Sequence, residues 1–141
     1  MGSAADRHRT AHDTFNRRDW DAAKELVKDD LRFEDRARNL TLKSGDEWVS
    51  WLQEWTTGLS DAKPDEPTYI DGGDYSVALF QGRGTHDGQL GPVPASGRRL
   101  DLPFCEVLHY DADGKIDRGE IYYDMMSMLV QLGAMDPPNM G

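Results

Sequence analysis

One carboxylate stands on a face that the sequence pattern marks as apolar. Residues 31–36 alternate as in a β-strand, which places Asp35 on the same side as Phe33. Burial raises the pKa of an aspartate, and a raised pKa suits a group that moves protons between carbon and oxygen near neutral pH. Asp35 is therefore a candidate general base. The alternative is a structural ion pair with Arg36 or Arg38.

Two further carboxylates belong to the C-terminal half of the chain. Asp124 directly precedes the helix-like run that begins at Met125, so its side chain caps that helix, acts as an acid or base, or does both. Glu106 interrupts an apolar row on the predicted strand 99–110. Arg83, on a neighbouring predicted strand, is the expected partner of Glu106 in a buried ion pair, and a general-base role is the alternative.

The histidines offer hydrogen-bond donors. His109 shares the strand of Glu106 but lies on its opposite face, and His86 follows a glycine-containing bend. His8 and His12 fall on the first predicted helix, where hydrogen-bonded structural roles are expected. No His, Asp or Glu residues show the spacing of metal ligands, and no glycine-rich segment has the order of a nucleotide site. We therefore expect neither a metal ion nor another cofactor.

A β-hairpin organises the elements that must hold these groups. The predicted strands are 31–36, 68–71, 75–86, 99–110 and 115–123. The last two are joined by a turn at Asp113-Gly114, and Asp-Gly is a strong hairpin signal because glycine reaches positive φ without penalty. Gly82 and Gly84 indicate a bend in their strand. Residues 61–67 are expected to form a polar, proline-marked connection.

Three helices are predicted in the N-terminal half and a short one near the C-terminus. The first begins after Ser3, and the second is capped by Asp19 and ends at the acidic pair 29–30, whose charges oppose the negative end of the helix dipole. The third begins after Ser44 in a Ser-x-x-Glu capping box. Its apolar stripe consists of Trp48, Trp51, Leu52, Trp55 and Leu59.

Composition excludes several classes of partner. The net charge of −10 opposes phosphate backbones and anionic membranes, so nucleic-acid binding is not expected. Cys105 is the single cysteine, which rules out an intramolecular disulfide. No apolar run approaches the ~18–20 residues of a membrane span, and the N-terminus lacks the apolar core of a signal peptide. We expect a cytoplasmic protein.

The order of these elements predicts an α+β fold. One domain would cover residues 1–141, with a core at 6–133 and a tail at 134–141. We expect a curved antiparallel sheet that three N-terminal helices and a short C-terminal helix close into a cone. Such a cone would enclose an apolar pocket.

Several motifs carry a family resemblance over about residues 6–133. Asp30-Leu31-Arg32-Phe33-Glu34-Asp35, followed by a tryptophan-rich helix, resembles the first half of the NTF2-like superfamily. The sequence is similar to the SnoaL-like polyketide cyclase branch in the motifs Gly84-Thr85-His86-Asp87-Gly88, Gly97-Arg98-Arg99, Leu102-Pro103-Phe104, Asp113-Gly114-Lys115-Ile116, Tyr122-Tyr123-Asp124 and Gln131-Leu132-Gly133. The resemblance implies the cone-shaped α+β fold.

The resemblance also implies roles for individual residues. Ketosteroid isomerases of this superfamily take a general-base Asp from the segment that matches Asp35. Their oxyanion-stabilising Tyr falls near Ala11, which cannot donate a hydrogen bond. SnoaL-type cyclases use an Asp near the end of the last strand, where Asp124 is the nearest match and Ile121 replaces an additional Asp of many relatives. Both aspartates remain candidates.

The implied function is that of a cofactor-free cyclase or isomerase of bacterial secondary metabolism. It would remove a proton next to a carbonyl of a polyketide-like or other small polycyclic substrate. Alternatives are epoxide hydrolysis or dehydration by Asp35 and Arg83, and a non-catalytic carrier of a hydrophobic molecule. The expected catalytic residues are Asp35, Asp124 and His109, and the expected substrate-binding residues are Trp51, Trp55, Phe33, Arg83, His86, Glu106 and Tyr123. A homodimer through the outer sheet face is expected, because both sides of the strand 99–110 carry apolar residues.

Overall fold

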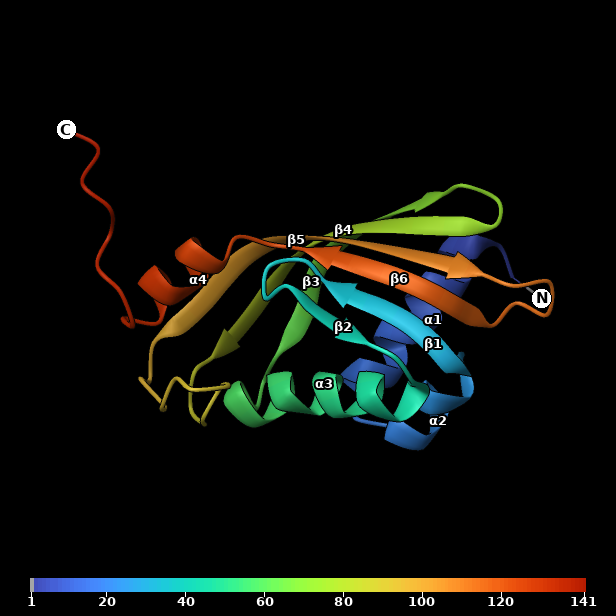
Figure 1. The fold of residues 1–141 in the computed structure, drawn as a ribbon, viewed down its shortest axis with the longest axis horizontal. Helices are drawn as coiled ribbons and strands as arrows, with labels where there is room; N and C mark the ends of the chain where they lie inside the picture. The colour runs from blue at the N-terminus through green and yellow to red at the C-terminus, as the bar shows by residue number, and fades with distance from the viewer. Residues whose placement is uncertain (1) are drawn as a thin grey trace.

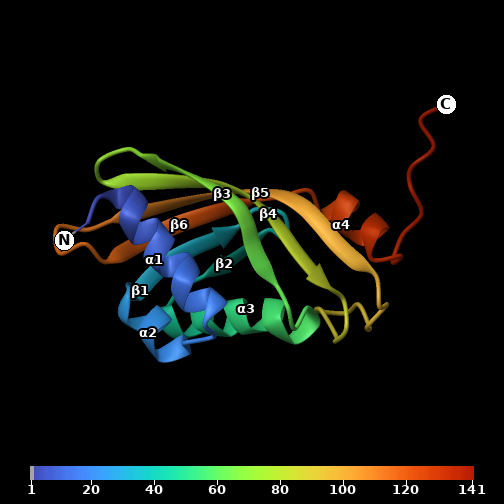
Figure 2. The same cartoon turned by 180° about the vertical axis from the view of Figure 1, so that it is seen from behind.

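The computed structural model describes residues 2–141 as a curved, unclosed six-stranded sheet with helices on its concave face (Figures 1 and 2). The helices are α1 (Ala4–Asn16), α2 (Trp20–Glu25), α3 (Gly45–Gly58) and α4 (Met125–Gln131). The strands are β1 (Val27–Asp35), β2 (Leu40–Leu42), β3 (Lys63–Asp71), β4 (Tyr75–Thr85), β5 (Arg99–Tyr110) and β6 (Ile116–Tyr122). Helices α1, α2 and α3 cover the concave face, and α4 packs beside β5 (Figure 1).

The predicted hairpin is confirmed as the centre of the sheet. The strand order is β2-β1-β6-β5-β4-β3, so the β5–β6 hairpin supplies the two middle strands. Gly114 in its turn has φ +82°, a conformation that favours glycine. The sheet is not wholly antiparallel, however: β1 runs parallel to β6, with Phe33 opposite Gly119. The expectation of a purely antiparallel sheet was therefore wrong at this one pair.

Two predicted boundaries were also wrong. Helix α2 ends at Glu25, and the acidic pair 29–30 lies within β1, because the Ile116 N–H donates to the Leu26 carbonyl and starts the parallel pairing one residue later. Part of the expected connection 61–67 is strand, since β3 begins at Lys63. Strand β3 lies at the sheet edge, where prolines are tolerated.

Some local features were not predicted at all. The short strand β2 pairs with β1 inside a segment that the sequence marks as loop. A bulge interrupts β3 between Asp65 and Thr68, where Glu66 has φ +49°. On the adjacent β4, a Cβ at Gly82 would lie 2.3 Å from the ring of Phe104, so glycine at this position lets that ring lie against the strand.

The core forms where α3 faces the concave side of the sheet. Trp48, Trp51 and Leu52 are buried on one stripe of α3, as the spacing predicts. Alternate residues of β5 are buried from Leu100 to Tyr110, and this places Glu106 on the inner face. The position of α3 therefore decides the shape of the space beneath β5.

We predict that the N-cap of α3 contributes measurably to stability. The Ser44 side chain accepts a hydrogen bond from the Glu47 backbone N–H at 3.1 Å. Ser44→Ala should lower the free energy of unfolding by about 1 kcal/mol, whereas Ser44→Asp, which keeps an acceptor, should lower it little. Ser50→Ala, an exposed position of the same helix, is the matched control. Urea denaturation gives the comparison, and equal effects of Ser44→Ala and Ser50→Ala would contradict the prediction.

Candidate active site

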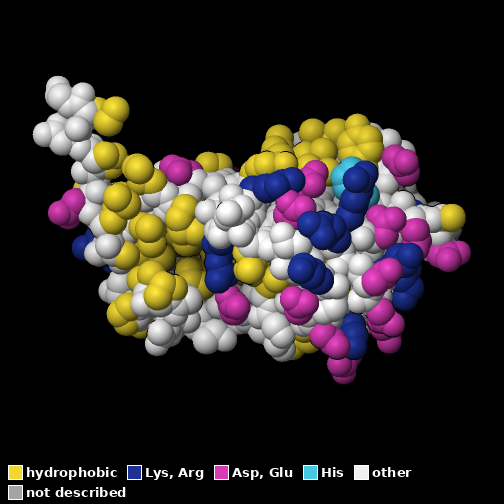
Figure 3. Space-filling view, viewed as in Figure 1, with side chains coloured by type: hydrophobic (Ala, Val, Ile, Leu, Met, Phe, Trp, Pro, Cys, Tyr) yellow, Lys and Arg dark blue, Asp and Glu magenta, His cyan; other side chains and the backbone are white. Residues whose placement is uncertain are grey.

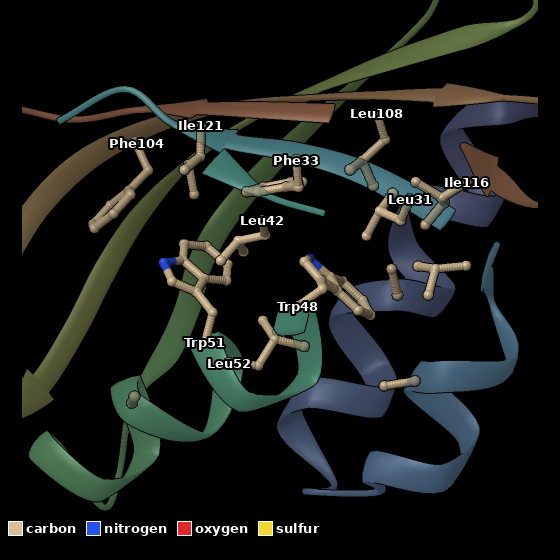
Figure 4. Packing of buried hydrophobic residues seen from close by; sticks show 14 of the residues in the cluster. Leu31, Phe33, Leu42, Trp48, Trp51, Leu52, Phe104, Leu108, Ile116 and Ile121 are labelled. Carbon is tan, nitrogen blue, oxygen red and sulfur yellow. The ribbon is translucent and has the colours of Figure 1, made fainter. Parts of the chain in front are cut away.

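An apolar pocket lies between α3 and the concave face of the sheet. Figure 4 shows Trp51 and Leu52 pointing from α3 toward side chains of the strands. The pocket contains about 720 Å³ of empty space when its open mouth is included. Most of its lining is apolar or aromatic: Trp48, Trp51, Leu52, Trp55, Leu59, Phe80, Leu100, Phe104, Leu108 and Ile121 belong to it. The ionisable residues that contribute to its lining are His12, Lys63, Arg83 and Glu106.

Glu106 forms a buried cluster with two histidines of α1. Its Oε1 atom lies 2.9 Å from His8 Nε2 and 2.9 Å from His12 Nε2. Helix α1 places the two histidines one turn apart, and β5 presents Glu106 opposite them. The exposed fractions are 0% for His8, 8% for His12 and 7% for Glu106. Glu106 and His12 belong to the pocket wall, while His8 lies behind it.

Hydroxyl groups fix the outer nitrogens of both imidazoles. His8 Nδ1 lies 2.7 Å from Ser76 Oγ, and His12 Nδ1 lies 2.8 Å from the Tyr69 hydroxyl. Ser76 Oγ in turn lies 2.8 Å from the Tyr110 hydroxyl. Each ring is thus held at both nitrogens, and the orientation of the cluster is determined by packing and hydrogen bonds together.

The cluster keeps Glu106 ionised. Burial alone would raise the pKa of this carboxyl, but hydrogen bonds from His12 and His8 outweigh burial and lower the pKa to about 2. Burial lowers the pKa of His8, and the neighbouring Glu106 opposes that shift. Among residues 2–141, no group hydrogen-bonds to Glu106 Oε2, and this atom is not among the fully buried unpaired ones. One carboxylate oxygen therefore remains accessible to a molecule in the pocket.

Asp35 is as deeply buried as predicted, and both of its carboxylate oxygens already accept hydrogen bonds from the protein. Its exposed fraction is 0%. Oδ2 accepts hydrogen bonds from Trp51 Nε1 at 3.0 Å and from the Tyr123 hydroxyl at 2.8 Å, and Oδ1 accepts from the Arg38 backbone N–H at 3.1 Å. Burial, followed by the proximity of Asp35, raises the pKa of Tyr123, so this hydroxyl stays protonated and donates. Asp35 is not part of the pocket lining.

The expected ion pairs of Asp35 do not form. Arg36 binds Glu34 at 2.6 Å, and the Arg38 guanidinium binds Glu54 at 2.9 Å. Neutral donors therefore compensate the burial of Asp35. The three donors come from α3, from the segment after β6 and from the turn after β1, so the aspartate ties these parts together.

Asp124 and His109 lie away from the pocket. Asp124 is the N-cap of α4: its Oδ2 accepts from Ser127, whose hydroxyl lowers the pKa of the exposed carboxyl. His109 lies on the outer face of β5, with its Nε2 3.8 Å from Glu120 Oε1. The structure therefore brings neither of these residues together with Glu106 or Asp35.

Arg83 and His86 occupy different positions from those expected. Arg83 forms ion pairs with Asp65, Glu66 and Asp101 at 2.8, 2.9 and 3.1 Å, and the first of these is the main cause of its raised pKa. The expected Arg83–Glu106 pair was wrong, because the two side chains leave opposite faces of the sheet. His86 is buried, and its Nδ1 accepts from the Ser96 N–H at 3.2 Å.

The aromatic residues predicted to bind substrate gather at the pocket. Trp55 meets Phe104 edge-on at 5.8 Å and Tyr123 at 5.6 Å, and Trp51 packs against Phe33 at 5.1 Å. Trp55 and Trp51 line the pocket, while Phe33 and Tyr123 support the wall from behind. These flat surfaces suit a flat ligand.

Sequence reasoning missed the histidine cluster. His8 and His12 are four residues apart on α1, and that spacing places them on one helix face. Their partner Glu106 follows 98 and 94 residues later, on a strand whose alignment with α1 no local pattern encodes. The three groups therefore have no sequence spacing characteristic of metal ligands, although they meet in space.

The comparisons identify the family. The model of the SnoaL-like polyketide cyclase family matches residues 5–132, and the chain belongs to this family. No curated protein matches the sequence significantly. None of the helices within residues 2–141 has the length and hydrophobicity to cross a lipid bilayer.

Solved structures share the fold at low sequence identity. A candidate polyketide cyclase from Pseudomonas putida superposes with a TM-score of 0.82 at 17% identity, covering 93% of this chain and 98% of that one. IdmH, a candidate polyketide cyclase from Streptomyces antibioticus, gives 0.80 at 21% identity, with coverages of 94% and 99%. AclR, a candidate hydroxylase from Streptomyces galilaeus, gives 0.79 at 20% identity, with coverages of 98% and 87%.

We predict that Asp35 is needed for stability. Asp35→Ala leaves the Trp51 N–H, the Tyr123 hydroxyl and a backbone N–H without an acceptor, and should cost about 2–4 kcal/mol of unfolding free energy. Asp35→Asn keeps one acceptor oxygen and should cost less. Asp30→Ala, an exposed position of β1, is the control in urea denaturation. An Asp35→Asn variant that is fully stable but inactive would instead identify Asp35 as the general base.

Proposed function

We propose that this protein is a cyclase- or isomerase-type enzyme that moves protons on a polyketide-like or other polycyclic molecule with Glu106. The observation that carries the proposal is the geometry of this carboxylate. Its Oε1 is held by His8 and His12 at 2.9 Å, and its Oε2 has no partner among residues 2–141. A fixed carboxylate with one free oxygen on an apolar wall can take a proton from a bound ligand.

The reaction follows from an acidic C–H bond next to a carbonyl group. Oε2 of Glu106 takes the proton, and the electron pair of the C–H bond moves into an enolate. The enolate carbon attacks a second carbonyl of the same molecule and forms a C–C bond, or it is protonated at another carbon. In the first case the resulting alkoxide takes the proton back from Glu106, which restores the carboxylate. No atom is lost, as in an intramolecular aldol reaction.

The pocket helps this chemistry in two ways. A ligand that fills it removes water from Oε2, and desolvation raises the basicity of a carboxylate whose pKa the histidines hold low. A methylene group between two carbonyls is acidic enough for such a weak base. Trp48 lines the pocket, and its buried indole N–H has no partner among residues 2–141, so it is the candidate donor to an enolate oxygen.

The lining of the pocket supports a polycyclic ligand. Most of the residues that form its wall are aromatic or aliphatic, as is typical of small-molecule sites. Phe80 and Phe104 stack with parallel rings at 5.3 Å on the pocket wall. Membership of a polyketide cyclase family agrees with this choice of substrate class. Action without a cofactor, a cytoplasmic location and a role in bacterial secondary metabolism are parts of the proposal.

A second enzymatic hypothesis, hydrolysis of an epoxide or dehydration, has less support. Epoxide hydrolysis or dehydration was expected to use Asp35 and Arg83 together. Asp35 is bound by three neutral donors, and Arg83 is bound by three carboxylates of other residues. We therefore favour Glu106 as the acid–base group.

We predict that Glu106→Gln abolishes proton transfer. The substitution keeps the shape but removes the base, and should lower the rate by about 10²–10⁴-fold. The measurement is deuterium exchange at the activated methylene of tricyclic aromatic β-keto esters in D₂O, followed by mass spectrometry. Glu120→Gln on the outer face of β6 is the matched control and should exchange like the wild type.

Three outcomes separate the hypotheses. Loss of exchange in Glu106→Gln with intact ligand binding supports the proposal. Full exchange in Glu106→Gln would exclude Glu106 as the base. A wild-type protein that binds the panel tightly without any exchange would be a carrier, and the enzymatic proposal would be wrong.

We also propose that the outer sheet face pairs two copies of the chain. Ile70, Tyr75, Leu79 and Tyr122 are large apolar residues with exposed fractions of 40–47%. Figure 3 shows apolar side chains gathered along the upper edge of the molecule, over β3 and β4. Leu79→Arg should convert a dimer into a monomer in light scattering, while Lys28→Ala on β1 should not. A monomeric wild type would contradict the proposal.

A further inference from the structure

The cluster of His8, His12 and Glu106 brings three metal-ligating atoms to one point. Both Nε2 atoms lie 2.9 Å from Glu106 Oε1, and all three atoms lie within 4.8 Å of one another. Neighbouring ligands of a first-row metal ion, bound at about 2.0–2.2 Å, are separated by roughly 3 Å. The cluster is therefore compact enough to bind one ion after small movements of its side chains.

The direction of the hydrogen bonds determines where the His8 proton lies. The Tyr110 hydroxyl donates to the Ala4 carbonyl at 3.3 Å, because a carbonyl can only accept. The Ser76 hydroxyl must then donate to Tyr110, and Ser76 Oγ accepts from His8 Nδ1–H. Nε2 of His8 therefore faces Glu106 Oε1 with a lone pair when the ring is neutral, and it donates to Oε1 when the ring is protonated. A metal ion bound to both atoms could take the place of that proton after small movements of the side chains.

The surroundings match the outer shell of a metal site. Histidines that bind metals donate their other N–H to an oxygen, which fixes the ring and the tautomer. Ser76 Oγ takes this position for His8, and the Tyr69 hydroxyl takes it for His12. Glu106 and His12 also reach the pocket wall, so a further coordination position would face the pocket.

We propose that His8, His12 and Glu106 form a binding site for a divalent first-row transition metal ion, with Zn²⁺ as the best match. Two imidazole nitrogens and one carboxylate oxygen are a ligand set that Zn²⁺ uses in sites with an open position. The ion replaces the protons between the nitrogens and the carboxylate, so binding releases protons. Magnesium and calcium, which prefer sets made of oxygen ligands, should bind far more weakly.

The metal-bound and proton-transferring states exclude each other. A Zn²⁺ ion on Oε1 neutralises Glu106 and makes Oε2 a poorer base, so the metal-free protein is the one that exchanges protons. This consequence rests on the proposed function, but metal binding itself does not. Absence of exchange in metal-free protein would count against the proposed function only, and absence of binding would count against the metal site only.

The test is calorimetric titration of tag-free, chelator-treated full-length protein with Zn²⁺, together with Co²⁺ as a spectroscopic probe. We expect one ion per chain, release of protons that varies with pH, a raised melting temperature and visible Co²⁺ absorption. The double variant His8→Gln/His12→Gln should bind at least about 100-fold more weakly, and Glu106→Gln about 10- to 100-fold more weakly. His109→Gln, which changes a histidine outside the cluster, is the matched control.

Circular dichroism establishes whether each variant is folded. The wild-type measurements keep the proposal testable even if the double variant unfolds, because stoichiometry, proton release and the Co²⁺ spectrum need no variant. Binding that fails to reach one ion per chain at micromolar Zn²⁺ would overturn the proposal. An equal loss of affinity in His109→Gln would overturn it as well, since the ion would then bind elsewhere.

Discussion

The structure depends on how the Glu106 carboxylate is accommodated inside the protein. An ionised carboxylate at 7% exposure is costly unless charged or hydrogen-bonding partners surround it. Helix α1 supplies both partners from one face, and it can do so only where it packs against β3 and β4 (Figure 2). The hydrogen bonds to Glu106 thus link three features. They join α1 to the sheet, orient the two imidazole rings and form the polar end of the pocket. Even the start of α1 takes part, because the Ala4 carbonyl ends the hydrogen-bond chain that begins at His8.

Asp35 shows the other way to bury a carboxylate. Its two oxygens accept three hydrogen bonds from neutral donors, and no arginine side chain within residues 2–141 pairs with it. This arrangement attaches α3 and the end of the sheet to β1, and it leaves no oxygen for a ligand. Glu106 receives both donors on one oxygen and keeps the other free. Under the proposed function, what separates Glu106 from Asp35 is therefore an oxygen without a hydrogen-bond partner, and burial alone does not reveal it.

Sequence patterns within single segments correctly predicted the structural features that depend only on neighbouring residues. The Asp-Gly turn, the Ser44 cap, the tryptophan stripe and the inward side of Asp35 follow from spacing and from backbone preferences, and all are present. The parallel pairing of β1 with β6 and the meeting of α1 with Glu106 were missed, because each joins segments about 90 residues apart. Arg83 was assigned to Glu106 by charge alone, although the alternation of β4 already places Arg83 on the face with Tyr75. His8 gave a usable signal, as a polar residue on an apolar helix face, but its partner could not be inferred.

Under the proposed function, the spacing along β5 limits which ligands Glu106 could act on. Phe104 and Glu106 are two residues apart on the same face, which separates them by roughly 7 Å along the strand. If a flat ring system packs on Phe80 and Phe104, a substituent at the edge of those rings that points toward Glu106 would lie within reach of Oε2. A ligand without such a substituent could fill the aromatic part and leave the carboxylate idle, and a short chain without rings would have nothing to fix its position. Specificity would thus follow from the distance between an aromatic surface and one acidic oxygen, whatever the ligand's other groups.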